Sequence, residues 1–358
     1  MKKRSRSFFH FFQLNILSVM ILFLCLFTGC TKDADREQAP VLPSYPGKSS
    51  VKEQDTIPED IPEEPAPVSD PHLSDPSQDP ESAQNPGKRD NTPRCLVPVA
   101  SGEITYGNEC VLLDASQTEH GYICVQYTGQ SPKVKLQLTG PDTVTYTYNL
   151  ATNVMDTFPL TGGNGPYRVG VYENISGTQY STAFYQELSV QIQNEFEPYL
   201  YPNQYVYFTP DSLAVAKAAE LSAIADTDLD VVAQIYNYVI GNVTYDYEKA
   251  SNIASGYLCD VDATLTSGTG ICLDYAALMA AMLRSQGIPT HLEVGYAKEA
   301  YHAWISTYVD EKGWINGIIE FDGKSWSLMD PTFAANSSEQ SLKKFIGDGS
   351  NYTVKYIY

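Results

Sequence analysis

The sequence has few positive charges, few histidines and only one long apolar run. Lysine and arginine total 23 against 43 aspartate and glutamate residues, which gives a formal net charge of −20 at pH 7. A polyanion of this size repels phosphate backbones, and no basic stripe offsets the repulsion, so the composition excludes nucleic-acid binding. The five histidines form no metal-ligand spacing with cysteines or acidic residues. We therefore expect no bound metal and no cofactor.

The fractions of charged and apolar residues are also not extreme. Charged residues make up 18% and apolar residues 43% of the 358 positions, which excludes a collagen, a coiled coil and a multispan membrane protein. The length exceeds one average domain, so we expect two domains with additional segments.

The one long apolar run lies near the N-terminus, at 14–27, and follows a cluster of basic residues. It is too short for a comfortable membrane span and typical of a secretion signal. The run ends in Phe27-Thr28-Gly29-Cys30, which resembles the lipobox of bacterial lipoproteins, with Phe27 in place of the usual leucine. The resemblance implies a signal peptide at 1–29 and a lipid anchor at Cys30 on the extracellular face of the cytoplasmic membrane. The alternative is a plain secretory signal in which Cys30 is incidental.

More than half of the 22 prolines fall in residues 30–94, interleaved with aspartate, glutamate and serine. Large apolar side chains are almost absent there, so the segment cannot bury enough surface to offset its ordering entropy. We interpret 30–94 as a disordered tether, long enough to carry a module into a cell wall.

Residues 95–198 alternate apolar and polar side chains with the period of half-buried strands, for example in 121–127 and 133–138. Turn signals separate these runs at the spacing of a sandwich, which predicts an all-β, immunoglobulin-like module. Its tyrosines either pack across strands or form a binding face for an unidentified ligand. An exported chain can form disulfides, but the sequence does not choose a pair among Cys95, Cys110 and Cys124.

The period changes to that of helices after residue 199. Thr209-Pro210-Asp211 predicts a helix start, followed by apolar positions at helical spacing from Leu213 to Ile224. Asp226-Thr227-Asp228 opens a second helix with a buried stripe. The members of that stripe are Val231, Val232, Ile235, Tyr236 and Val239.

A third predicted helix, at 273–285, begins directly after Cys272 and stops at Gly287. Unpaired N–H groups and the positive end of the helix dipole favour the thiolate, which attacks carbonyl carbon. The same N–H groups can receive the oxyanion of a tetrahedral intermediate. Cys272 is therefore a candidate nucleophile.

A thiolate nucleophile needs a base, and two histidines follow the third helix. His302 lies in a strand-like run, 301–305, where alternation sends His302 and Trp304 to one face. His291 begins the preceding strand, and we interpret it as structural. Asp330 ends a later strand and could hold a histidine ring in the useful tautomer.

Three blocks now carry a family resemblance: Gly270 to Ala276 around Cys272, His302-Ala303-Trp304, and Asp330-Pro331-Thr332. They look like the catalytic blocks of the transglutaminase-like superfamily, in the order Cys, His, Asp. The resemblance implies a papain-like α+β catalytic domain at 199–358. It also implies Cys272 as nucleophile, His302 as general acid/base and Asp330 as the orienting carboxylate.

Two positions depart from the family pattern. Ile305 follows the His302 block where many relatives have asparagine, and the aromatic oxyanion residue of animal transglutaminases has no secure match. Tyr257 and Trp304 are the candidates for oxyanion or cleft residues, with Tyr257 slightly ahead of two earlier tyrosines, Tyr245 and Tyr247.

The sequence thus predicts a surface cysteine acyltransferase, peptidase or amidase that acts on a protein or peptide, including wall peptide. The second hypothesis is a non-catalytic adhesion or scaffold protein that binds through its β-sandwich. For the cysteine itself, the simplest competing interpretation is a disulfide between Cys259 and Cys272.

Overall fold

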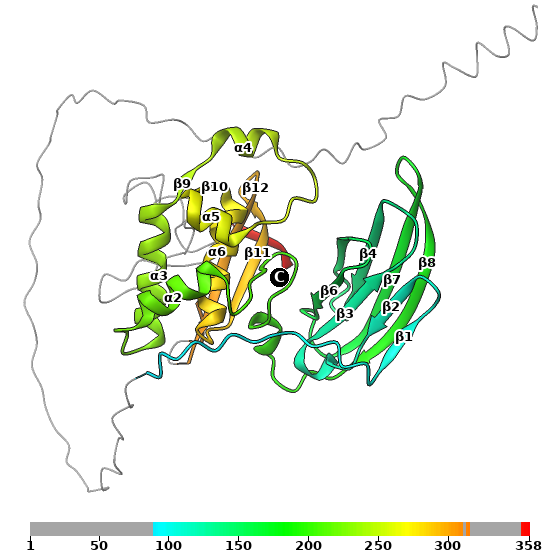
Figure 1. Ribbon diagram of the computed structural model, residues 1–358, viewed down its shortest axis with the longest axis horizontal. Helices are drawn as coiled ribbons and strands as arrows, with labels where there is room; N and C mark the ends of the chain where they lie inside the picture. Colours follow the sequence, from blue (N-terminus) through cyan, green and yellow to red (C-terminus); the bar gives the residue numbers. More distant parts are fainter. Residues whose placement is uncertain (1–88, 311–312, 316–351) are drawn as a thin grey trace, which may run out of the picture. The chain divides into compact units, whose positions relative to one another are not determined.

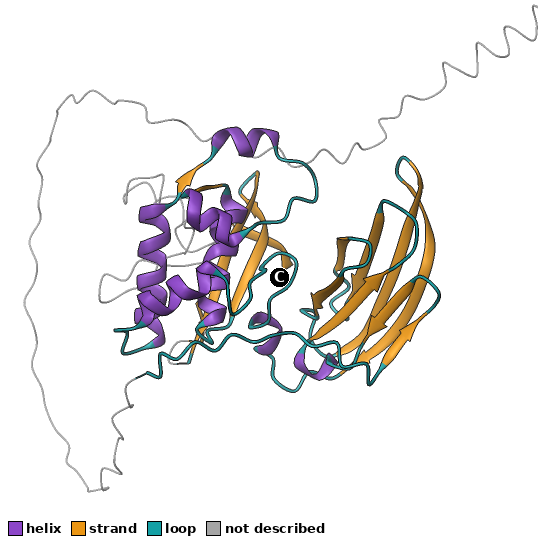
Figure 2. Cartoon of the chain, viewed as in Figure 1, coloured by secondary structure: helices purple, strands orange, loops and turns teal. Residues whose placement is uncertain are grey.

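The computed structural model describes residues 89–310, 313–315 and 352–358 (Figure 1). These residues form a strand-rich module followed by a module of helices and strands (Figure 2). Among them, no helix is long and apolar enough to cross a membrane. The signal segment, Asp330 and residues 30–88 of the predicted tether, Cys30 among them, lie outside the described residues. The end of the predicted tether, 89–94, is described, and its hydrogen bonds to the helical module show that the prediction of disorder is wrong there.

Two antiparallel four-stranded sheets make the first module, in the orders β1-β2-β3-β6 and β5-β4-β7-β8. The strands are β1 (Thr105–Gly107), β2 (Val111–Asp114), β3 (Tyr122–Tyr127), β4 (Val134–Thr139), β5 (Thr145–Leu150), β6 (Met155–Pro159), β7 (Gly165–Ser176) and β8 (Gln179–Val190). Short 3-10 turns occupy Thr118–His120 and Glu197–Tyr199. The two strands predicted at 121–127 and 133–138 are confirmed as β3 and β4. Strand β4 buries alternate residues on one face, whereas five of the six residues of β3 are buried.

The buried faces of the two sheets share one core. Alternate residues of β4 and β5 are buried, and they belong to the same apolar cluster as those of β3. The rings of Tyr148 on β5 and Phe158 on β6 lie 4.8 Å apart, edge to face, which joins the sheets. Tyr146 and Tyr148 are 6% and 2% exposed, so both pack instead of forming a binding face. The immunoglobulin-like assignment stays a prediction.

The second module is a mix of helices and sheet. Its helices are α2 (Leu213–Ser222), α3 (Asp228–Asn242), α4 (Tyr247–Asn252), α5 (Val261–Ser267) and α6 (Cys272–Ser285). A four-stranded antiparallel sheet has the order β13-β12-β11-β14, and β9 pairs with β10 in parallel. These strands are β9 (Thr244–Tyr245), β10 (Thr269–Gly270), β11 (Thr290–Ala297), β12 (Ala300–Val309), β13 (Gly313–Ile315) and β14 (Tyr352–Ile357).

Helix α6 is the centre of this module. It packs against α2, α3 and α5 and also against β11 and β12. All of its residues except Leu273 are buried, because it has neighbours on every side. At its C-terminal end the fully buried Arg284 donates to the carbonyl oxygens of Thr290 and Tyr358, which ties the helix to the sheet. Burial lowers the pKa of Arg284 to about 9.

Helix α3 follows the sequence prediction closely. Thr227 and Asp230 form a reciprocal capping box at its start, and the five residues of the predicted stripe are all buried. Short-range sequence signals are sufficient to predict α3, because the capping residues and the apolar stripe all lie within or next to this one helix.

Helix α2 differs from its prediction. Leu213 and Ile224, at the two ends of the expected apolar pattern, are 56% and 78% exposed, whereas Ala214, Val215 and Ala218 are buried. The segment is alanine-rich, so its apolar pattern hardly distinguishes one face of the helix from the next.

The N-cap of α2 is Ser212 instead of Thr209. The side chain of Asp262, from α5, accepts from the first two N–H groups of α2.

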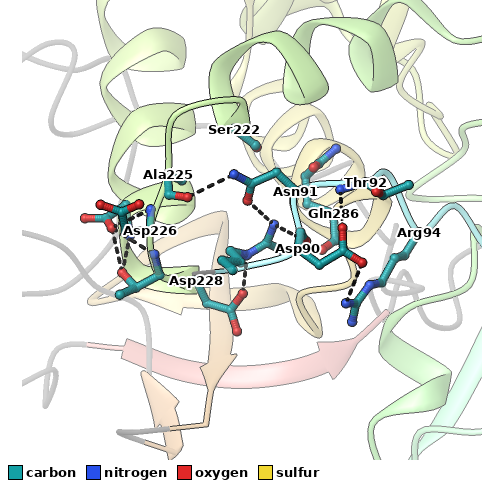
Figure 3. A network of polar contacts seen from close by, with 12 residues as sticks. Asp90, Asn91, Thr92, Arg94, Ser222, Ala225, Asp226, Asp228 and Gln286 are labelled. Atoms are coloured by element: carbon teal, nitrogen blue, oxygen red, sulfur yellow. Dashed lines mark hydrogen bonds and ion pairs between the residues drawn. The ribbon is translucent and has the colours of Figure 1, made fainter. Parts of the chain in front are cut away.

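The segment 89–94 lies against the helical module (Figure 3). The Arg89 side chain donates to Asp228 at 2.6 Å and to the carbonyl oxygen of Gln286 at 2.6 Å. Asn91 donates to the carbonyl oxygen of Ala225 at 2.9 Å. The chain is therefore attached to α3 and to the end of α6 before it enters the first sheet.

Candidate functional site

Cys272 is the first residue of α6 and is 4% exposed. The N-cap is Ile271, whose apolar side chain cannot accept a hydrogen bond from the first turn. The N-cap side chain therefore leaves the N–H groups of the first turn free, although the Asp274 carboxylate in the same turn accepts from Ile271 N at 2.8 Å. The structure thus places Cys272 where the sequence predicted it, at the N-terminus of a buried helix.

All five cysteines in the described part of the chain, including Cys272, are free thiols. The disulfide proposed as the alternative for Cys259 and Cys272 is therefore not formed, and neither is one among Cys95, Cys110 and Cys124. Burial raises the pKa of Cys259, and the nearby Asp274 carboxylate raises it further. Cys259 is held as the neutral, unreactive thiol.

His302 lies on β12 and is 2% exposed. Its ring stacks on that of Trp304, with centroids 6.3 Å apart and an interplanar angle of 22°, so the two share a face as predicted. Gly295 is its cross-strand partner on β11, at a shift in the register between β11 and β14. A Cβ at Gly295 would lie 2.0 Å from the carbonyl oxygen of Thr353, so only glycine fits opposite the histidine.

Helix α6 begins at Cys272 and packs against β12, the strand that carries His302. Tyr301 directly precedes His302, and burial raises the pKa of its phenol. The fold therefore brings the helix that starts at Cys272 into contact with the strand that carries His302.

The two cleft candidates have different environments. Trp304 is 2% exposed and packs edge to face on Tyr352 at 5.0 Å, so it is a core residue in the described structure. Tyr257 donates its hydroxyl to Asp274 Oδ1 at 2.6 Å. Burial raises the pKa of Tyr257, and the bond to Asp274 raises it further. The single proton of that hydroxyl is thus directed at Asp274, and an oxyanion role would require it to turn away.

Asp274 is the functional candidate that sequence reasoning missed. A carboxylate in the first turn of a helix is favoured by the helix dipole alone, so its position in the sequence does not point to a further role. In the structure Asp274 is fully buried and accepts from Ile271 N at 2.8 Å, Lys249 Nζ at 2.6 Å and Tyr257 Oη at 2.6 Å. The partners Lys249 and Tyr257 lie 25 and 17 positions earlier, so no local pattern could have indicated them.

His291 is part of an aromatic cluster. Its ring centroid lies 3.8 Å from that of Trp314 and 4.0 Å from that of Tyr199, and Nδ1 lies 3.4 Å from Glu293 Oε1. Burial lowers the pKa of His291, while Glu293 acts in the opposite direction. These contacts agree with the structural role expected for this histidine.

The described ranges, 89–310, 313–315 and 352–358, contain no group of three or more histidine, cysteine or acidic residues placed to hold a metal ion.

Comparisons with known proteins locate the site within a described family. Residues 215–317 match the model of the transglutaminase-like superfamily. That range includes Cys272 and His302 and ends before Asp330. The match therefore covers less than a third of the chain, within the module of helices and strands.

Two curated relatives share part of the chain. UPF0252 protein MJ1282 of Methanocaldococcus jannaschii is 24% identical over 147 residues, 38% of this chain and 40% of that protein. Uncharacterized protein YebA of Bacillus subtilis is 27% identical over 149 residues, 35% of this chain and 20% of that protein. The match spans less than half the length of either relative. Among solved structures, red sea bream transglutaminase is 15% identical with a TM-score of 0.23, over 59% of this chain and 48% of that one.

Proposed function

We propose that this protein is a cell-surface thiol acyl-transfer enzyme that acts on peptide or glutamine-type amide bonds. The observation that carries the proposal is the free Cys272 thiol at the unblocked N-terminus of α6, with the strand that bears His302 packed on the same helix. The match of residues 215–317 to the transglutaminase-like model supports the same reaction type.

In the first step, the Cys272 thiolate attacks the amide carbonyl carbon and the carbonyl electrons move to oxygen. The N–H groups of the first turn of α6 stabilise that oxyanion. When it collapses, the C–N bond breaks, the imidazolium of His302 gives its proton to the leaving nitrogen, and a thioester to Cys272 remains.

In the second step, water or a primary amine attacks the thioester. Neutral His302 removes a proton from the nucleophile, the C–S bond breaks, and the thiolate and imidazolium are restored. Water gives hydrolysis, whereas an amine gives a new amide. Asp330 is the proposed carboxylate that holds the His302 ring in the productive tautomer.

We also propose that the enzyme is a lipoprotein anchored at Cys30 on the extracellular face of the membrane. The basic segment, the apolar run and the small residues before Cys30 support this location. The proline-rich tether would then separate the anchor from the folded modules, within reach of wall peptides or neighbouring proteins. A Cys30→Ala variant that stayed in the membrane fraction, without incorporated lipid label, would contradict this location.

The activity is tested by incubating the mature protein with a glutamine-containing casein, with and without a primary amine. Mass spectrometry then follows cleavage, ammonia release and amine incorporation, which distinguish peptidase, deamidase and transamidase. Cys259→Ala is the matched control, because it removes a buried thiol outside the helix start. Equal turnover by Cys272→Ala and Cys259→Ala would disprove a thiol mechanism at α6. An unreactive Cys272 in the folded, reduced protein would favour the binding or scaffold alternative.

A further inference from the structure

We infer that Asp274, Lys249 and Tyr257 form a positioning unit for the nucleophile, which we call the carboxylate clamp. This inference rests on the proposed function of Cys272. The clamp does not touch substrate. It acts by fixing the backbone on both sides of Cys272, so that the thiol and the N–H groups of the first turn keep one geometry.

The central carboxylate is placed two residues after Cys272, in the same turn of α6, and is fully buried. Oδ2 accepts from Ile271 N at 2.8 Å and from Lys249 Nζ at 2.6 Å, while Oδ1 accepts from Tyr257 Oη at 2.6 Å. Bonds to a carboxylate are about twice as strong as neutral ones, so both of its oxygens are firmly held. The bond to Ile271 N reaches the residue directly before the nucleophile.

The contacts close into a ring. The backbone N–H of Asp246 donates to the carbonyl oxygen of Gly270 at 2.9 Å. The Asp246 side chain then caps α4 by accepting from Lys249 N at 2.8 Å. Lys249 Nζ completes the ring at Asp274, which accepts from Ile271 N. The strand before Cys272 and the helix turn after it are therefore held by the same element, α4.

Two further contacts, at Gly270 and between Lys249 and Tyr257, support the clamp as one unit. A Cβ at Gly270 would lie 2.7 Å from the Asp274 Cβ, so glycine is needed for the carboxylate to fold back toward the helix start. The Lys249 ammonium also lies 4.6 Å from the centroid of the Tyr257 ring, which links the two donors to each other.

Stability alone does not account for this unit. Replacing a buried ion pair with apolar residues is often neutral or stabilising, because the desolvation penalty of the charges offsets their attraction. The Asp274 carboxylate is fully buried, while the Lys249 side chain is 31% exposed, so the desolvation penalty of the carboxylate makes this pair a poor way to strengthen a helix end. Its position around the nucleophile, with bonds to the backbone next to Cys272, is what favours a positioning role.

The test uses full-length, mature protein and compares three variants: Asp274→Asn, Lys249→Met, and the double variant. Asp274→Asn keeps the shape but replaces one acceptor oxygen with a donor, so the bond at Oδ1 or the two bonds at Oδ2 are lost. Lys249→Met alone leaves an unpaired buried carboxylate and destabilises, whereas the double variant removes both charges. Lys249→Arg keeps the charge and tests for rescue.

Each variant is measured for kcat and KM on the casein substrate, for Tm, and for the rate of iodoacetamide alkylation at Cys272. Peptide mapping separates that alkylation from labelling at Cys259. Lys217→Met is the matched control, because Lys217 pairs with Glu220 and lies 5.4 Å from the Tyr238 ring in a similar arrangement on α2 and α3.

We expect Asp274→Asn and the double variant to lose about 100-fold in kcat with little change in KM, since misplacing a reacting group by ~1 Å can cost that much. The double variant should regain the Tm lost by Lys249→Met without regaining kcat. Lys249→Arg should recover most of the activity, and Lys217→Met should match the wild type. Recovery of kcat together with Tm in the double variant would show that the unit is structural only.

The alkylation rate keeps the test independent of the substrate. If the wild type turns over no casein but Cys272 reacts rapidly and the Asp274 variants react slowly, the proposed activity fails and the clamp stands. If wild-type and Asp274→Asn thiols react equally and turn over casein equally, the clamp is wrong and the proposed activity stands. Should Asp274→Asn not fold, Tyr257→Phe removes one bond from the same carboxylate and is measured in the same way.

Discussion

At the scale of single residues, Cys272 and Cys259 are two of the three buried thiols in the described residues, and their surroundings differ. Cys272 lies at the positive end of α6, with no side chain capping the helix start. Cys259 is buried beside the Asp274 carboxylate, which together with burial raises its pKa. Since only the thiolate is nucleophilic, the two residues should differ in reactivity although both are reduced.

We predict that Cys272→Ala and His302→Ala each lower kcat/KM by ~10³-fold or more, because members of such a unit act together. Asp330→Ala should be milder, since orientation is partly retained by the strand. Steady-state kinetics of amine incorporation measure all three variants. Cys259→Ala should keep the wild-type rate. A loss of similar size in that variant would contradict the assignment of Cys272 as the reactive thiol.

Because His291 is buried, we predict that the stability of the protein depends on pH. Burial lowers its pKa, with a smaller contribution of the same sign from Arg284 and an opposing one from Glu293. The unfolded chain therefore binds the proton more readily, near pH 6.5. The contribution of neutral His291 to the free energy of unfolding is fully present above that pH and is lost as the pH falls below it. Thermal unfolding at pH 7.5 and 5.5 measures the loss, which should shrink in His291→Gln. An unchanged loss in that variant would contradict the assignment.

At the scale of elements, the site depends on one irregularity in the sheet. Strand β11 changes register against β14 between Val294 and Gly295, directly opposite His302. Bulges of this kind re-aim side chains next to active sites. Gly295 is essential to it, because the backbone of β14 occupies the space where a Cβ would lie.

Gly295→Ala should destabilise the domain by about 1–3 kcal/mol, the usual cost of forcing an added methyl group into a packed site. Urea unfolding provides the measurement. The matched control is Gly241→Ala in α3, where a Cβ would meet no atom within 4 Å. That change should stabilise by about 0.5–1 kcal/mol, because alanine favours helix. If both substitutions shifted stability in the same direction, the steric argument would be wrong.

At the scale of the whole molecule, the segment 89–94 attaches the chain to the helical module before the first sheet begins (Figure 3). The Arg89 side chain is 10% exposed and joins Asp228 on α3 to the carbonyl oxygen of Gln286. By contrast, the Arg94 side chain pairs with Asp90 among the described residues, and both side chains are about 60% exposed. The two arginines therefore form a natural comparison between a buried and an exposed contact.

Arg89→Ala should lower the free energy of unfolding by about 1–3 kcal/mol, the cost of leaving the partners of a buried charged donor unsatisfied. Arg94→Ala should change it by less than about 1 kcal/mol, as for most exposed pairs. Chemical denaturation of the mature chain compares them. A larger effect from Arg94→Ala would show that the segment is not held through Arg89.

The sequence by itself determined the features that are written locally. Alternation fixed strands β3 and β4, and the capping box with its apolar stripe fixed α3, because those signals lie within one element. The placement of Cys272 at a helix start and of His302 on a strand followed in the same way. The catalytic roles of these two residues, and that of Asp330, stay predictions.

Only the tertiary structure decided what lies around them. Asp262 caps α2 from 48 or more positions away, and Lys249 reaches Asp274 across 25. The need for glycine at position 295 likewise arises from β14, far along the chain. Periodicity and capping act over a few residues, whereas pairing of buried polar groups depends on which segments the fold brings together. The sequence therefore indicated Cys272 as the candidate nucleophile, and the fold placed Asp274, Lys249 and Tyr257 together in and around the helix turn that carries it.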